Sequence, residues 1–310
     1  MSVIIVRAMQ ELPMGIANAG NTCFAGALLQ CLRTVKVSAS AIASSVDPLD
    51  QLVASMQAAH GPVMHIETPL IREIYNAELG LQGQQCPMQV FAASCRKGGT
   101  IAESFNAEMS EVLKCGTCEV ALNKPQTSTD NHIQMLKFDA HTTARTLTEL
   151  ILDNIVSARI EGYIFTTHND NTNTERACVN KQGAFHMRYF SLALPQHLCF
   201  ALTSRTEYTA AKNTRYLAPQ HSMVLPELNM ASHQNSQVTK NAEYSLFGTV
   251  VHSGYSAETG HFSAYVLRDG AWFFIDDEHS RPVSAFKVIQ PPPHQTLYMV
   301  FYRRVLHFCF

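Results

Sequence analysis

The spacing of hydrophobic residues changes along the chain, from a helical period in the first half to a strand period in the second. Before about residue 160, apolar side chains recur at helical spacing in segments bounded by polar, proline or glycine residues. The predicted helical segments are 23–32, 38–59 (on both sides of Pro48), 69–80, 84–94, 103–113 and 146–160. The first third of the chain is therefore predicted to be helical.

Beyond about residue 182, short apolar or alternating runs alternate with turn residues such as Asp269-Gly270, a pattern typical of antiparallel strands. The predicted strands are 185–194, 198–202, 223–225, 244–252, 261–268, 271–275 and 296–303. Helices followed by strands indicate the α+β class.

The first predicted helix begins at a cysteine. In the stretch GIANAGNTCFAGALLQCL, Cys23 follows a run rich in Gly and Asn and starts an apolar segment. Asn21 or Thr22 is suited to cap this helix, because short polar side chains accept hydrogen bonds from its first amides. The positive end of the helix dipole favours a thiolate there. The alternative is a buried cysteine in an ordinary amphipathic helix, so other residues must decide.

Composition narrows the class of protein. The 310 residues are 46% hydrophobic and 15% charged with a net charge of −2, which gives no electrostatic signal for nucleic acid or membrane lipid. The nine cysteines are scattered in a way unlike a disulfide framework. No signal-peptide layout and no run of about 18 uncharged apolar residues is present. We expect a monomer of the cytosol or nucleus without membrane insertion.

Histidines in the second half offer a partner for the thiol. The segment VVHSGYSAETGHFSAYV contains His252 and His261, and the later strand WFFI ends at Asp276. A hairpin turning at 269–270 would put His261 opposite Asp276. The carboxylate can then hold the imidazole through Nδ1, leaving Nε2 to take the proton of Cys23. Each feature alone is more often a loop histidine or a solvated turn, but together they predict a Cys-His-Asp site.

These segments resemble a known family. GIANAGNTCFAGALLQCL is similar to the cysteine box of the ubiquitin-specific proteases, which are papain-like deubiquitinating enzymes, and YSLFGTVVHSGYSAETGHFSAYV with WFFIDDE is similar to their histidine box. QQCPMQVF, LPQHLCFAL and TLYMVFYRR resemble further motifs, so the resemblance spans about residues 12–304. It implies one catalytic domain with a helical thumb (about 12–115), β fingers (about 116–200) and a β-rich palm (about 200–304).

The resemblance also implies roles for the site residues. Cys23 would be the nucleophile, His261 the general base and then acid, and Asp276 the residue that orients the imidazole. Asn18 matches the family's oxyanion-stabilising asparagine, and Asp277 is a second choice for assisting the site. The implied reaction is attack on the carbonyl of the C-terminal glycine of ubiquitin, through a thioester that water hydrolyses.

Further residues would contact the substrate. The resemblance places the glycine tail of ubiquitin in a narrow channel lined in part by the histidine-box loop, where glycine leaves room for another backbone. The implied substrate-binding residues are Gln84, Gln85, Ser253, Gly254, Gly260, Tyr265 and Trp272.

The chain departs from the family pattern in its Gln-Gln box. Cys86, Pro87 and Gln89 stand where the family usually has an acidic residue, an Ala and a Glu, and the acidic positions face arginines near the tail of ubiquitin. Two alternatives to ubiquitin hydrolysis therefore stay open: a catalytically weak or inactive ubiquitin-binding pseudoenzyme, or a protease for another ubiquitin-like modifier.

A metal site is a separate question. The resemblance implies that Cys115, Cys118 and Cys178 could hold a structural zinc in the fingers, with Glu175 or His168 as the fourth ligand. A metal-free remnant of such a site is the alternative, because the second C-x-x-C pair is missing. No cofactor is expected for catalysis.

Overall fold

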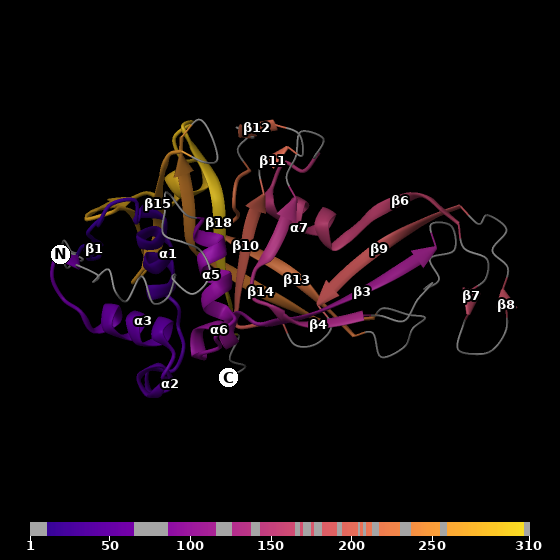
Figure 1. Cartoon of the computed structure of the whole chain (residues 1–310), viewed down its shortest axis with the longest axis horizontal. Coiled ribbons are helices and arrows are strands. Elements are labelled where there is room, and N and C mark those ends of the chain that lie inside the picture. Colours follow the sequence, from indigo (N-terminus) through magenta and orange to yellow (C-terminus); the bar gives the residue numbers. More distant parts are fainter. Residues whose placement is uncertain are drawn as a thin grey trace, which may run out of the picture.

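The protein is elongated, with helices at one end, a large β-sheet in the middle and a second sheet extending to the other end (Figure 1). The computed structural model describes residues 11–64, 86–115, 126–137, 143–164, 168–169, 175–176, 182–190, 194–203, 205–206, 209–212, 217–229, 237–254 and 259–306. The predicted helix 69–80 lies outside these residues.

The helices of the N-terminal third agree with the sequence pattern. Their bounds are α1 Cys23–Arg33, α2 Ala39–Ser44, α3 Pro48–Ala58, α5 Pro87–Cys95 and α6 Thr100–Phe105; α7 Leu147–Ile155 and α8 Ala285–Ile289 follow later. The start of α3 shows why the break falls at Pro48. The Asp47 carboxylate accepts hydrogen bonds from the amides of Leu49 and Asp50, and proline fits the first helical position because it has no amide hydrogen to satisfy.

The central sheet has eight strands in the order β17-β16-β15-β14-β18-β10-β5, with β13 also paired to β14. Their bounds are β5 Gln134–Lys137, β10 His197–Thr203, β13 Ser222–Asn229, β14 Gln237–Ser253, β15 His261–Arg268, β16 Ala271–Asp276, β17 His279–Val283 and β18 Gln295–Arg304. All neighbours are antiparallel except β10 and β5. The strands predicted between 198 and 303 are confirmed, with β5 and β17 as additions.

The second sheet has four strands in the order β4-β3-β9-β6. Its strands are β3 Ala107–Cys115, β4 Gln126–Asn131, β6 Val156–Ile164 and β9 Gln182–Phe190. Short two-stranded pairs complete the described strands: β1 Gly15–Ile16 with β2 Val63–Met64, β7 His168–Asn169 with β8 Glu175–Arg176, and β11 Arg205–Thr206 with β12 Thr209–Lys212.

Two helix predictions fail where this second sheet forms. The segment 103–113 is helical only to Phe105 and then becomes β3, and the segment 146–160 is helical only to Ile155 and then becomes β6. Both contain good helix formers, but β9 pairs with both strands, and this long-range pairing outweighs local propensity. The predicted boundary near residue 115 between thumb and fingers stays a prediction; β3, which ends at Cys115, pairs with β4 and β9 of the second sheet.

Hydrophobic residues pack on both faces of the central sheet. One buried cluster joins α1, α3, α5 and α6 to β14, β15, β16 and β18, and it includes Cys23, Phe24, Phe262 and Ala264. The other cluster lies under α7 and α8 and includes Tyr265, Trp272 and Phe274. Successive residues of β15 alternate between the two clusters, as the two-residue period of a strand requires.

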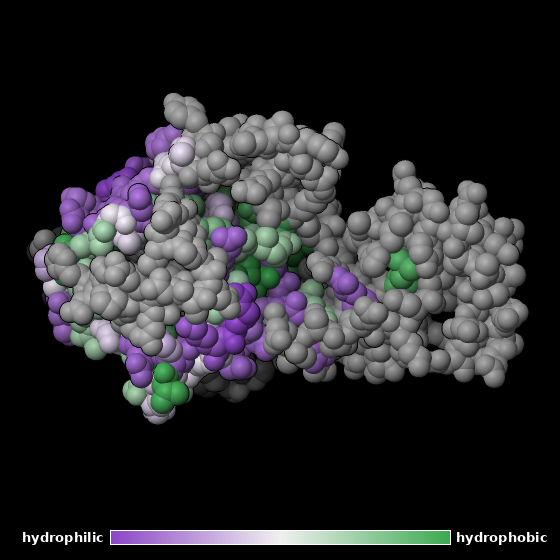
Figure 2. All heavy atoms as spheres, in the orientation of Figure 1, coloured by the Kyte–Doolittle hydropathy of each residue, from purple (hydrophilic) through white to green (hydrophobic). Residues whose placement is uncertain are grey.

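Figure 2 shows one face of the protein, coloured by hydropathy where residues are described. On the face shown in Figure 2, hydrophilic side chains cover most of the coloured surface and hydrophobic ones form small areas. The exposed large hydrophobic residues are scattered over the described ranges: Leu12, Val46, Met135, Val224, Phe286 and Leu306. None of the helices in the described part of the chain has the length and hydrophobicity needed to cross a membrane.

A buried carboxylate links two helices of the N-terminal third. The Asp50 side chain on α3 is 0% exposed and accepts hydrogen bonds from the amides of Thr100 (2.6 Å) and Ile101 (3.0 Å) at the start of α6. These amides carry the positive end of the α6 dipole, which favours a negative partner. The contact fixes α6 against α3.

We predict that Asp50→Ala lowers the free energy of unfolding by about 3 kcal/mol, because it leaves two buried amides without their charged acceptor. Asp50→Asn keeps one side-chain oxygen and should lose less. Urea unfolding measures both, as a lower midpoint with an unchanged slope. A midpoint for Asp50→Ala equal to that of the wild type would contradict the assignment.

Candidate active site

The candidate nucleophile lies at the first position of α1. Cys23 is 4% exposed and belongs to the buried cluster between α1 and the sheet. Thr22 occupies the cap position, but its side chain makes no cap hydrogen bond. Its hydroxyl instead accepts from the Ala19 amide and donates to Asn18 Oδ1. Thr22 therefore stabilises the preceding loop, and the expectation that its side chain caps the helix is wrong.

Asn18 organises that loop. Its Oδ1 accepts hydrogen bonds from the amides of Gly20 (3.0 Å) and Thr22 (3.1 Å), which closes the turn before α1. Its Nδ2 donates to Asp277 Oδ2 at 2.9 Å, across 259 residues of sequence. An amide nitrogen carries two hydrogens, so the hydrogen bond to Asp277 uses one of the two N–H groups of Asn18.

The segment before Asn18 is anchored to the end of the hairpin β16–β17. The Ile16 amide donates to the carbonyl of Asp277 at 2.8 Å. A Cβ atom at Gly15 would lie 2.2 Å from the carbonyl oxygen of Glu278, so only glycine permits this approach. This requirement of Gly15 has no local sequence signal, because the partner is far along the chain.

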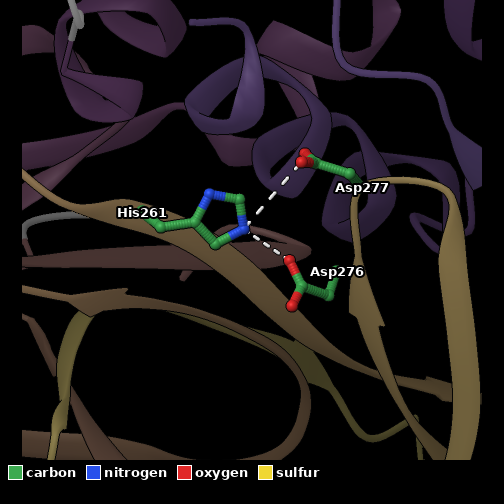
Figure 3. Close-up of side chains that lie close together, drawn as sticks. All are labelled: His261, Asp276 and Asp277. Carbon is green, nitrogen blue, oxygen red and sulfur yellow. Dashed lines mark hydrogen bonds and ion pairs between the residues drawn. The ribbon is translucent and has the colours of Figure 1, made fainter.

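The candidate base and its carboxylate come from the adjacent strands β15 and β16. His261 Nε2 contacts Asp276 Oδ1 closely (Figure 3). Ala264 pairs with Ile275, so the same register places Asp276 opposite residue 263 and diagonal to His261 on the same face. The predicted contact is present, but the two residues are diagonal rather than directly opposite.

The structure reverses the predicted use of the imidazole nitrogens. Nε2 is held by Asp276, so Nδ1 is the nitrogen left for the hydrogen bond between His261 and Cys23. Asp276 is two residues away from the position directly opposite His261, and this register is not determined by the sequence pattern. The prediction that Nδ1 contacts the carboxylate and Nε2 contacts the thiol is wrong.

The electrostatics favour a charged imidazole. Its hydrogen bond to Asp276, and then that to Cys23, raise the pKa of His261 to about 10 despite partial burial. The same contact with His261 lowers the pKa of Asp276 below its usual value. The side chains of His261 and Asp276 are 38% and 45% exposed, so solvent screens the pair. The imidazole of His261 is therefore protonated at neutral pH.

Asp277 is a second carboxylate near the His261 ring. Its side chain is 20% exposed, and its Oδ2 lies 3.9 Å from His261 Nε2. Ligand atoms of His261, Asp276 and Asp277 lie within 4.8 Å of one another and form the one cluster with metal-ligand composition found among the described residues. Two of these contacts are those of His261 Nε2 with Asp276 and with Asp277.

The residues expected to bind substrate fall into three groups. Gln84 and Gln85 lie outside the described residues. Ser253 ends β14, and its carbonyl oxygen lies 2.3 Å from where a Cβ at Gly260 would be. His252 Nε2 lies 2.5 Å from that position, and a Cβ at Gly254 would lie 2.4 Å from the Thr259 carbonyl oxygen. Neighbouring backbone and the His252 ring therefore occupy the positions where a side chain at residue 254 or 260 would lie.

Tyr265 and Trp272 do not fit a direct contact with substrate. Their exposed fractions are 1% and 7%, and both belong to the buried cluster under α7 and α8. The Tyr265 hydroxyl donates to Gln295 Oε1 at 2.8 Å. Their strand positions put them on the face of β15 and β16 that is covered by α7 and α8. Their aromatic character alone could not reveal which face they occupy.

The zinc prediction stays untested. Cys118 and Cys178 lie outside the described residues. Cys115 ends β3, and the backbones of His168 and Glu175 belong to the paired strands β7 and β8. The strand pairing of β7 with β8 places these last two residues in one small hairpin.

Comparison with known families identifies the class of protein. A family model described as ubiquitin carboxyl-terminal hydrolase matches residues 49–302. The chain therefore belongs to this family, and the predicted resemblance to ubiquitin-specific proteases is confirmed. The matched range contains His261 and Asp276 and begins after Cys23, so the nucleophile segment rests on the geometry described above.

Curated relatives match parts of the chain. It is 33% identical over 96 residues to ubiquitin carboxyl-terminal hydrolase 10 of Mus musculus. This match covers 30% of this chain and 12% of that protein. It is 20% identical over 332 residues to ubiquitin carboxyl-terminal hydrolase 23 of Arabidopsis thaliana, covering 95% of this chain and 36% of that protein. The chain thus spans a minor part of the length of these relatives.

Two solved structures share the fold. One is the SAGA DUB module of Ubp8, Sgf11, Sus1 and Sgf73 bound to ubiquitin aldehyde, with a TM-score of 0.65 and 18% identity over 97% of this chain and 72% of that chain. The other is this module bound to monoubiquitin, with a TM-score of 0.66 and 16% identity over 98% and 73% of the two chains. The predicted α+β fold of the ubiquitin-specific protease type is confirmed.

The contact with Asp276 should set the protonation of His261. We predict that the ring hydrogens of His261 do not titrate between pH 6 and 8 and do so near pH 10, because the raised pKa keeps the imidazolium. Its contribution to stability is then full below pH 6.5, the ordinary value, and is lost as the pH rises through about 10. NMR titration of the ring measures this directly.

Asp276→Asn removes the main cause of the raised pKa and should lower the midpoint of His261 by at least about one pH unit, the scale of a charge-assisted hydrogen bond. Asp269→Asn is the matched control, because Asp269 lies in the turn at the other end of the same hairpin. An equal shift in both variants would contradict a specific contact.

Proposed function

We propose that the protein is a thiol-dependent deubiquitinase that hydrolyses the isopeptide or peptide bond after the C-terminal glycine of ubiquitin. The observation that carries this proposal is the position of one imidazole, that of His261, between the Cys23 thiol and the Asp276 carboxylate. Membership of the ubiquitin carboxyl-terminal hydrolase family supports the reaction, and the ubiquitin bound in the two similar structures supports the substrate.

The geometry supports a sequence of proton transfers. The imidazolium of His261 stabilises a thiolate on Cys23, which attacks the carbonyl carbon of the terminal glycine. His261 then gives its proton to the leaving amine, and a thioester remains on Cys23. In the second half, neutral His261 takes a proton from the attacking water, and the thiolate leaves as the thioester is hydrolysed. Asp276 keeps the ring oriented throughout.

The oxyanion of each tetrahedral intermediate needs hydrogen-bond donors. We assign this role to the second N–H of Asn18 Nδ2 and to the backbone amide of Cys23, the latter because the first amides of a helix have no partner within it. The first N–H of Asn18 is held by Asp277, which fixes the direction of the amide plane. The donor is thereby oriented before substrate binds.

Labelling with ubiquitin that carries a C-terminal electrophile tests the function. We expect the probe to modify wild-type protein at Cys23 and not to modify Cys23→Ala, because the thiolate is the nucleophile. Cys86→Ala is the matched control at saturating probe, since Cys86 is the half-buried thiol that hydrogen-bonds Tyr298 and lacks a histidine partner in the described structure. Peptide mapping identifies the modified residue.

His261→Ala should slow labelling by about 10²–10⁴-fold with the fold intact, the usual value of general acid–base catalysis. Unlabelled wild-type protein at saturating ubiquitin probe would overturn the proposal. Parallel probes built on other ubiquitin-like modifiers, compared by labelling rate, decide whether ubiquitin is the modifier.

The oxyanion role of Asn18 gives a separate prediction. Asn18→Ala should lower kcat by about 10²–10³-fold with little change in ubiquitin affinity, because a donor used only in the transition state is lost. Thr22→Val is the control, since it removes the loop hydrogen bonds of the Thr22 hydroxyl while keeping the Asn18 amide nitrogen. Equal losses of kcat in the two variants would show that Asn18 acts only through loop structure.

A further inference from the structure

A cavity of about 320 Å³ opens at the end of α1 that is far from Cys23. Arg33, the last residue of α1, lines it and lies ten positions after Cys23, which is about 15 Å along the helix. The turn Asp269-Gly270 also lines it, at the end of β15 opposite to His261. The cavity is therefore separate from the candidate active site.

Positive charge is concentrated around this cavity. Arg33, Lys36, Arg268 and Arg303 all line it, and the single acidic residue of the lining is Asp269. The whole chain carries a net charge of −2, so this excess is a local feature. The four cations come from α1, the segment after it, β15 and β18, which are held together by the fold.

Arg33 is the most buried of these cations, with 9% of its surface exposed. Its Nη2 donates to the Ala59 carbonyl at 3.3 Å, while Nη1 is buried and has no hydrogen-bond partner among the described residues. Burial, and then the charge of Arg268, lower the pKa of Arg33 to about 10. A buried cation without a carboxylate is costly, and a bound anion would offset that cost.

The other two guanidinium groups, those of Arg268 and Arg303, also line the cavity. Arg268 Nε lies 3.6 Å from Asp269, whose side chain is 78% exposed and thus screened by water. The Arg303 guanidinium lies over the Phe247 ring at 5.6 Å, an arrangement that positions the group without neutralising its charge. Burial lowers the pKa of Arg303 below its ordinary value.

We propose that this cavity binds a small anion bearing phosphate groups, held by Arg33, Arg268 and Arg303. The planar guanidinium fork matches phosphate oxygens in pairs, and several such groups around one cavity suit an anion with more than one negative charge. The volume lies at the lower end of the range for small-molecule sites. The bound anion would connect the end of α1 to the central sheet.

Inorganic pyrophosphate is the probe for this site, in calorimetric titration and thermal unfolding of the whole chain at constant ionic strength. A ligand that binds only the folded state stabilises it, so we expect the melting temperature to rise by about 5 °C at 100 times the dissociation constant. The measurement needs neither ubiquitin nor catalysis, so its outcome is independent of the proposed activity.

Variants locate the binding. Arg268→Gln and Arg303→Gln should each weaken pyrophosphate binding by about 10-fold or more, the value of a lost charge-assisted hydrogen bond. Arg281→Gln is the matched control, because Arg281 lies over the Phe274 ring at 4.8 Å but does not line the cavity, and it should bind as the wild type does. The two test residues are half-buried, which favours intact folding.

Three results would overturn the proposal. They are no heat or stabilisation with pyrophosphate, unchanged affinity in both Arg268→Gln and Arg303→Gln, and an equal rise in melting temperature with sodium chloride at the same ionic strength. Citrate, which carries similar charge on carboxylates, tests the chemistry. Equal affinity for citrate would reject the assignment to phosphate.

Discussion

The packing of α1 on strand β15 is the interaction on which the site depends. Cys23 belongs to the same buried cluster as Phe262 and Ala264, the apolar residues that follow His261 on β15. Burial of apolar surface is non-directional, but close packing fixes where each helix residue lies. The distance between the candidate nucleophile and base is therefore set by the core, although the two residues are far apart in sequence.

Hydrogen bonds then orient the loop before α1 and the His261 ring, which the packing of the core has brought close together. Asp277 accepts hydrogen bonds through its backbone from Ile16 and through its side chain from Asn18, and it lies near the His261 ring. One residue of the β16–β17 turn thus touches the loop before the helix and the imidazole. Its neighbour Asp276 holds that imidazole. Two adjacent carboxylates divide the tasks of fixing the loop and fixing the base.

Sequence reasoning succeeded where the signal is local. The helix beginning at Cys23 and the hairpin carrying His261 and Asp276 follow from period, turn residues and strand ends, and the structure has all of them. It failed for β3 and β6, because their strand state depends on pairing with β9. Strand register decides which imidazole nitrogen meets Asp276 and which face of the sheet carries Tyr265, and the sequence pattern leaves that register undetermined. The need for glycine at position 15 depends on a neighbour far along the chain.

The contact between Gly15 and the Glu278 backbone has a consequence for how the chain matures. During synthesis, residues 15–33 leave the ribosome long before the turn at 277–278 exists. Until then the thiol has no imidazole, and the loop before it lacks its anchor. In a nascent chain the Cys23 thiol therefore lacks these contacts, which form only after residues 261–278 have been synthesised and have packed against α1.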